Sequence, residues 1–228
     1  MDTEAPGASQ GSTTNVEPPN SEKPLTDDPF FCVHHCDGHC CRDYTVLVTA
    51  QDARRIIDRV PGLDVLDFIC FYHGEVETQN YYPKINIQGE EYVLGILTHD
   101  KTESCVFQTG LGLCGIHDFS PMVCQTYPFT LTADDEVTYI EGVYCKELFP
   151  PVDPDRVVRV VHQSWREIKV YRELVAEWNG RLSHRGTRKF LKFAGLVDYE
   201  EPPGPERDLK FDWEAHESDE EYEEYEDY

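Results

Sequence analysis

The chain has 228 residues, which is enough for one substantial hydrophobic core, so it does not need disulfide bonds merely to stay folded. Hydrophobic residues make up 39% of it, which excludes a wholly disordered chain, and no apolar run approaches the roughly 20 residues that cross a bilayer. The formal net charge is -24. A chain this acidic repels phosphate backbones, which argues against nucleic-acid binding through a broad basic surface.

Most of the charge lies at the two ends. Residues 1–29 hold six acidic residues and one basic residue, and residues 200–228 hold fourteen and two. We predict a flexible leader over 1–28, a cysteine-rich domain over 29–199 and an acidic disordered tail over 200–228. The leader has no basic start and no apolar segment, which predicts a cytoplasmic protein with reduced thiols. Arginine supplies twelve of the twenty basic residues, which hints at a salt-loving source.

The first element after the leader is a cysteine-rich turn, FCVHHCDGHCCRDY, which begins at Phe31. Its four cysteines follow the pattern Cys-x3-Cys-x3-Cys-Cys. The intervening residues are mostly polar, so they cannot bury four thiols as a hydrophobic core. Asp37 and Gly38 let the backbone curl, which would bring the thiols together.

Two helices are predicted next. Thr49 can cap the first, with Asp52 returning the capping bond, and Pro61-Gly62 ends it. A second short helix is predicted over 64–72. It holds Cys70 among apolar residues, and we interpret Cys70 as a buried cysteine that packs as a small hydrophobe.

Strands and a long helix complete the domain. Residues 83–100 alternate around Gln88-Gly89 and predict an antiparallel hairpin, and residues 129–145 predict another that turns at Asp134-Asp135. Ser120-Pro121 is expected to open a short helix between them. From Asp153 to about residue 180, an apolar stripe predicts a long helix, and a shorter helix follows. The fold class is therefore α+β, with short antiparallel strands braced by helices.

Soft-metal binding explains the cysteines better than core packing or disulfides do. A disulfide scaffold needs an oxidising compartment, and adjacent Cys40 and Cys41 are poor partners because their Cα atoms are only about 3.8 Å apart. Neighbouring side chains diverge, so both members of this pair need not ligate one atom. The candidate metal ligands are Cys32, Cys36, Cys40, Cys41, Cys105, Cys114, Cys124 and Cys145. One mixed site, two sites and a multinuclear cluster all stay open.

The later cysteines are expected to complete the site. Cys105 and Cys114 flank a glycine-rich loop, and Cys124 lies near the start of the predicted short helix. The positive helix end there is expected to lower the pKa of Cys124 and to ready its thiolate for metal.

The histidines are weaker candidates. His34, His35 and His39 suit zinc or iron, but we interpret them as exposed polar residues of the turn, and His117 is expected to hydrogen-bond a nearby carboxylate. No phosphate-binding loop, dinucleotide fingerprint or serine-nucleophile elbow is present. The catalytic residues therefore stay unknown.

The cysteine-rich turn, the segment VLVTAQDARRI and the later CGIHDFSPMVCQTYPF resemble the YkgJ-type cysteine-cluster family. That family is described as zinc- or iron-chelating and is often labelled as iron–sulfur, and a flagellin lysine N-methylase is similar to it. The resemblance covers roughly residues 31–145. It implies that all the candidate ligands except Cys145 correspond to the family's cysteines. This chain departs from the family pattern in three places. The interval between Cys36 and Cys40 is one residue longer, His117 stands where tyrosine is usual, and Ser120 stands where arginine is usual.

Three functions are consistent with these residues. The first is a cytoplasmic protein that holds an iron–sulfur cluster or iron, in redox or methyl-transfer chemistry with an unknown protein or small-molecule partner. The second is a non-catalytic zinc module in which the metal supports folding. The third is a disulfide-stabilised interaction domain without metal. Whether the chain is an enzyme stays open.

Overall fold

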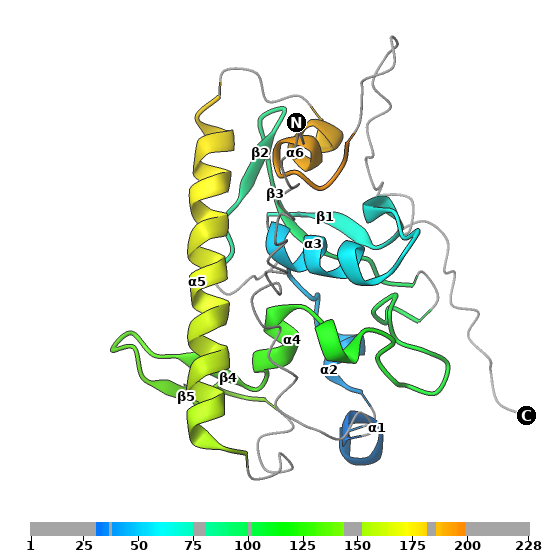
Figure 1. Cartoon of the computed structure of the whole chain (residues 1–228), viewed down its shortest axis with the longest axis vertical. Helices are drawn as coiled ribbons and strands as arrows, with labels where there is room; N and C mark the ends of the chain where they lie inside the picture. The colour runs from blue at the N-terminus through cyan, green and yellow to red at the C-terminus, as the bar shows by residue number, and fades with distance from the viewer. Residues whose placement is uncertain are drawn as a thin grey trace, which may run out of the picture.

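The computed structural model in Figure 1 describes six segments of the chain: residues 31–36, 38–74, 81–99, 102–143, 152–181 and 186–198. The predicted leader, the acidic tail and Cys145 lie outside them. The backbone of the helix that contains Cys32 and Cys36 is described, but these two side chains are not.

A three-stranded antiparallel sheet lies at the centre of the fold. β1 (Ile69–His73), β2 (Ile85–Ile87) and β3 (Glu90–Ile96) pair in the order β1-β3-β2. Gln88 and Gly89 join β2 to β3 with φ values of 57° and 92°, as a two-residue hairpin turn of the primed type requires. This confirms the first predicted hairpin.

β1 corrects one prediction from the sequence. The segment that we expected to form a short helix with Cys70 begins as a single 3-10 turn, Val65–Asp67, and then becomes a strand. Cys70 pairs with Gly95, and Phe71 pairs with Leu94 on β3. Isoleucine, cysteine and the aromatic residues of this run fit a strand, and pairing with β3 outweighs their weak helical periodicity.

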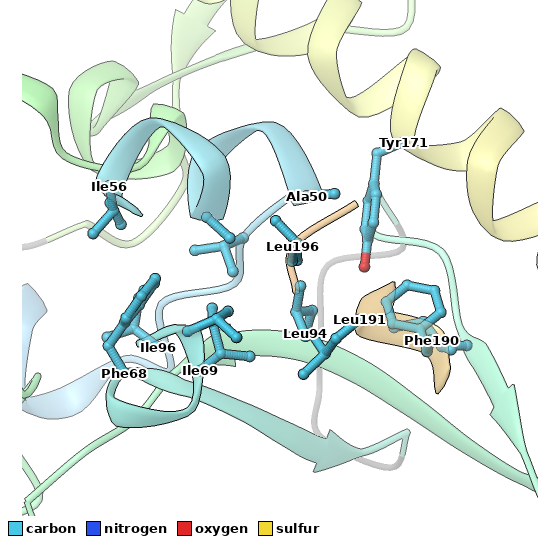
Figure 2. Close-up of a cluster of buried hydrophobic side chains, with 14 of the residues drawn as sticks. Ala50, Ile56, Phe68, Ile69, Leu94, Ile96, Tyr171, Phe190, Leu191 and Leu196 are labelled. Carbon is cyan, nitrogen blue, oxygen red and sulfur yellow. The ribbon is translucent and has the colours of Figure 1, made fainter. Parts of the chain in front are cut away.

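Helices cover this sheet and close the main core. α3 (Ala50–Arg59), α5 (Pro154–Asn179) and α6 (Thr187–Phe193) all contribute buried side chains to one cluster. Figure 2 shows side chains from α3, α5 and α6 meeting those of the strands, with Tyr171 of α5 directed into the cluster. α3 begins with the predicted capping box, in which Thr49 accepts from the backbone N–H of Asp52. The apolar stripe predicted for α5 is buried, as expected.

A second hairpin packs against the first half of α5. β4 (Phe129–Leu131) pairs with β5 (Val137–Tyr139), and Phe129 joins Val157 and Val160 of α5 in a smaller core. α1 (Phe31–Cys36), α2 (Cys40–Asp43), the 3-10 turn η2 (His117–Phe119) and α4 (Met122–Thr126) are all short. In Figure 1 they lie on one side of α5, toward the end that is distant from α6.

The architecture is α+β, as the sequence predicts: helices surround short antiparallel strands, and the long helix follows them. None of the helices within the described segments combines the length and the apolar character that crossing a bilayer requires.

Candidate metal centre

The turn between α1 and α2 is shaped for close contact with a distant loop. Gly38 is buried and has a φ of 66°, which a glycine adopts without strain. A Cβ on Gly38 would lie 2.6 Å from Nε2 of Gln108 and 3.6 Å from the carbonyl oxygen of Gly112. The first cysteine segment therefore packs directly on the loop that connects Cys105 to Cys114.

A backbone hydrogen bond joins the two cysteine groups. The N–H of Cys105 donates to the carbonyl oxygen of Cys41 over 2.8 Å. Cys105 also bridges to Thr98, beyond β3, and Gln108 bridges to Cys114 across the glycine-rich loop. Cys41, Cys105 and Cys114 are thus held by main-chain contacts, although more than sixty residues separate the first from the second.

Backbone N–H groups are directed at two of the sulfurs. The Cys105 thiol accepts from the N–H groups of Phe107 and Gln108, and the Cys114 thiol accepts from Ile116. Burial dominates over these bonds: it raises the pKa of Cys105 to about 12 and that of Cys114 to about 11, with Cys41 raising both further. The metal-free thiols hold their protons, while N–H donors are in place to stabilise thiolates.

Cys124 belongs to the same group of thiols. It lies on α4, and part of the residue is exposed to solvent, but protein atoms surround the thiol itself. This burial is the main reason why the pKa of Cys124 is well above the ordinary value. Cys41, Cys105 and Cys114 each raise it further by electrostatic repulsion. We call Cys41, Cys105, Cys114 and Cys124 the four-thiol group.

The predicted lowering of the Cys124 pKa is wrong. α4 has only five residues, so its dipole is small even though Cys124 lies in its first turn. Burial and the negative charge of Asp52 act in the opposite direction. The thiol therefore needs a metal ion, rather than the helix end, to release its proton at neutral pH.

The adjacent pair at the start of α2 behaves differently from our expectation. Cys40 hydrogen-bonds to Cys41 through their side chains, so the two thiols do not diverge. This bond is the largest cause that lowers the pKa of Cys41, and the nearby Arg42 also lowers it. The surroundings of Cys41 therefore favour its thiolate, in contrast to those of Cys105, Cys114 and Cys124.

Cys70 lies apart from this group. It packs in a small cluster with Leu47, Tyr72 and Val93, and burial raises its pKa to about 11. This placement matches its interpretation as a packed hydrophobe and makes it a control position.

The histidines have other contacts. His34 and His35 are exposed, and His35 packs against the ring of Phe31. Nδ1 of His39 contacts the Asp43 carboxylate. Nδ1 of His117 lies 3.7 Å from the Asp118 carboxylate, which is too long for the expected hydrogen bond.

The four-thiol group is not yet a closed coordination cage. Among the described residues, no three His, Cys, Asp or Glu side chains are arranged to hold one ion as they stand. All six cysteines with described side chains are free thiols. Cys145 and the side chains of Cys32 and Cys36 lie outside the description. The donor chemistry nevertheless fits zinc and iron, because both bind thiolate sulfur.

Two features of the site were missed by reading the sequence. The N–H···S bonds depend on the conformation of the loop backbone, and no residue type in the sequence indicates them. Asp52 was recognised only as a capping residue, although its carboxylate also accepts from the N–H of Met122 on α4. The distance between the two residues along the chain left no signal for that contact.

A family model described as "CxxCxxCC: Putative zinc- or iron-chelating domain" matches residues 31–146, which is just over half of the chain. The matched region contains the four-thiol group and Cys145. No curated protein and no solved structure matches the chain.

Proposed function

Because the chain belongs to the CxxCxxCC family of zinc- or iron-chelating domains, we propose that it binds a soft metal centre through cysteines from both ends of the matched region. The observation that carries the proposal is the four-thiol group, in which Cys41 lies within electrostatic reach of three thiols from 105–124. Crowding several buried thiols has no packing advantage, whereas it is what a thiolate site requires.

The proposed ligands are the eight cysteines other than Cys70. The four-thiol group forms the centre of the site, and Cys40 hydrogen-bonds to one of its members. Cys32, Cys36 and Cys145 complete the set by their positions in the sequence. A bound ion would draw the sulfurs together, and the N–H donors at Cys105 and Cys114 would compensate part of the thiolate charge.

We propose iron, as an iron–sulfur cluster or as iron ions, for the occupant. Eight thiols exceed the four that one tetrahedral ion uses, and N–H···S bonds are among the means by which proteins adjust cluster potentials. When bound, such a centre would supply one-electron redox chemistry. The protein would then act in a reducing compartment with a redox or methyl-transfer partner, in line with the resemblance to the YkgJ-type family and the flagellin lysine N-methylase.

Zinc is the second candidate. One tetrahedral zinc ion uses four thiolates, which is the number in the four-thiol group, and a bound zinc ion would stabilise the fold without taking part in a reaction. In that case the protein is a structural or interaction module.

Purification without oxygen separates these functions. Brown protein with iron and acid-labile sulfide supports the cluster, and colourless protein with stoichiometric zinc supports the module. Cys36→Ser and Cys114→Ser are expected to lose most of the metal, whereas Cys70→Ser keeps it because Cys70 packs elsewhere. Equal metal content in all three variants would remove the ligand assignment, and absence of metal from the wild-type chain would remove the function.

A further inference from the structure

Asp52 makes more hydrogen bonds than a helix cap needs. Its carboxylate is fully buried, with 0% of the residue exposed. Oδ2 accepts from the backbone N–H of Thr49, which is one half of the capping box of α3, and also from the Thr49 hydroxyl, both at 2.9 Å. Oδ1 accepts from Nη1 of Arg55 and from the backbone N–H of Met122, both at 2.8 Å. The last bond leaves α3 and reaches α4.

The bond to Met122 satisfies the start of a helix that has no cap of its own. α4 begins at Met122, and its N-cap residue, Pro121, provides no capping side chain. Met122 is 3% exposed, so an unpaired N–H there would cost roughly 1–3 kcal/mol. The other side-chain bonds of α4 stay within its own segment: Gln125 donates to Ser120, and Thr126 donates to Met122.

The same carboxylate is fixed from a third helix. Nη2 of Arg55 donates to Oε2 of Glu167 on α5 at 2.6 Å, and Glu167 also accepts from Gln163. Asp52 and Arg55 therefore tie α3, α4 and α5 together through one polar network. Cys124 follows Met122 by two residues, which is about 3 Å along a helix axis.

We propose that Asp52 is the positioning residue of the four-thiol group, because its bond to Met122 holds α4 so that Cys124 faces the other three thiols. The Asp52 carboxylate lies close enough to the Cys124 thiol to raise its pKa, so its contribution to the site is the placement of α4 and not the ionisation of this thiol. The metal-dependent part of the inference rests on the proposed function. The placement of α4 does not, and it can be measured on the metal-free protein.

Asp52→Ala is the test variant, and Thr49→Ala is its matched control. Asp52→Ala leaves the N–H of Met122 and the guanidinium of Arg55 without their shared acceptor. Thr49→Ala removes the hydroxyl half of the capping box and leaves both of those bonds intact. Both changes weaken the start of α3, so a difference between the variants reports on the two bonds of Oδ1, to Met122 of α4 and to Arg55, and exchange measured within 122–126 isolates the first of them. Asp52→Asn, which keeps the size and one acceptor, serves if the alanine variant does not fold.

The first measurement is hydrogen exchange on metal-free protein. In Asp52→Ala, exchange is expected to rise at least tenfold in the peptide that covers 122–126, whereas in Thr49→Ala it rises only at the start of α3. Equal exchange of 122–126 in both variants would overturn the proposal, whatever the metal does.

The second measurement titrates the full-length protein with Co²⁺ and follows the sulfur-to-cobalt absorption. Asp52→Ala is expected to weaken Co²⁺ binding about 10–100-fold, as the loss of a contact that supports a metal ligand commonly does. It is also expected to lose the absorption of one cobalt-bound thiolate, and Cys124→Ser should lose the same absorption. If Asp52 acts through Cys124, adding Asp52→Ala to Cys124→Ser changes the spectrum and the affinity no further. Additive losses would contradict the proposal. A wild-type chain that binds no Co²⁺ would count against the proposed function alone, and hydrogen exchange would still decide the role of Asp52.

Discussion

Cys105 and Cys114 show that a cysteine can be prepared for metal while its thiol stays protonated. Burial raises the pKa of Cys105 to about 12 and that of Cys114 to about 11, but N–H donors already point at both sulfurs. At neutral pH each thiol must lose a proton before its sulfur can bind an ion. Metal binding and proton release are therefore coupled at these two residues.

The coupling predicts how metal affinity depends on pH. Below the pKa of a thiol that must ionise, the apparent metal affinity rises about tenfold for each pH unit. With two such thiols, the apparent affinity rises about a hundredfold for each pH unit. Titration with Zn²⁺ in weakly buffered solution with a pH indicator should show at least two protons released per ion near pH 7. Release of fewer than one proton would mean that Cys105 and Cys114 are not ligands.

The sign of the stability effect follows from the same shifts. Both pKa values are higher in the folded metal-free protein than the ordinary 9.0, so between pH 9 and about 11–12 the folded state binds more protons than the unfolded state. The contribution of these thiols is complete below pH 9 and is lost as the pH rises through that window. The free energy of unfolding, measured by urea denaturation at several pH values, should fall in this window. Cys105→Ala should make that fall with pH less steep.

Gly38 allows a second prediction at the scale of one residue. Gly38 and Gly62 both have positive φ, at 66° and 83°, so alanine at either position costs roughly 1–2 kcal/mol of backbone strain. Only at Gly38 would the new Cβ meet another segment, the Gln108 side chain at 2.6 Å, whereas Gly62 has open space. We expect similar losses of unfolding free energy from Gly38→Ala and Gly62→Ala.

Metal binding should separate these two glycine variants. Gly38→Ala should weaken Co²⁺ binding by up to about tenfold because the new Cβ displaces the Gln108 side chain from the contact between the α1–α2 turn and the loop that carries Cys114. Gly62→Ala should leave Co²⁺ binding unchanged. The same affinity in both variants would show that this contact does not set the distance between the two cysteine segments.

Among the elements, those with a local signal were predicted well. The capping box of Thr49 and Asp52, the Gln88-Gly89 turn and the apolar stripe of α5 are each encoded within a few residues, and the structure contains all three. β1 was predicted as a helix because its identity depends on pairing with β3, in which Cys70 pairs with Gly95, 25 residues further along the chain. The same contrast between local and long-range signals applies to the candidate site. The spacing of the cysteines can be seen in the sequence, whereas the contact of Asp52 with α4 cannot.

The C-terminal end of α5 illustrates how a helix can protect a sheet edge, and it provides a prediction about stability. β2 is an edge strand, and the N–H of Asn86 donates to Oδ1 of Asn179 at 2.8 Å, while Nδ2 of Asn179 donates to the carbonyl of Lys84 at 2.8 Å. Asn179→Ala removes two hydrogen bonds and should lower the free energy of unfolding by about 1–2 kcal/mol.

Urea denaturation measures this effect, and Glu177→Ala is the control. Glu177 lies on the same turn and forms an exposed ion pair with Arg181, which contributes less than about 1 kcal/mol. Neither change should alter metal content, because this end of α5 contacts β2 rather than the four-thiol group. Loss of metal in Asn179→Ala would show that the two regions are coupled.

At the scale of the whole molecule, the metal centre and the main core are joined but distinct. The main core is formed by side chains of α3, the sheet, α5 and α6 (Figure 2). Of the four-thiol group, only Cys105 and Cys114 pack against it, and both are partly buried. The apolar stripe of α5 is buried among the hydrophobic side chains of the main core and of the smaller core. The fold therefore has a source of stability that does not depend on the ion.

This arrangement predicts that a chelator weakens the protein without unfolding it. At a free metal concentration 100 times the dissociation constant, bound metal adds about 2.7 kcal/mol to the free energy of unfolding, which chelation removes. Far-ultraviolet circular dichroism should retain the signal of α5, and hydrogen exchange should rise around 38–44 and 105–124 while α5 and β3 stay protected. Cooperative loss of all helical signal on chelation would instead mean that the thiols nucleate the whole fold, as in small zinc domains, and would favour the structural zinc function over the redox one.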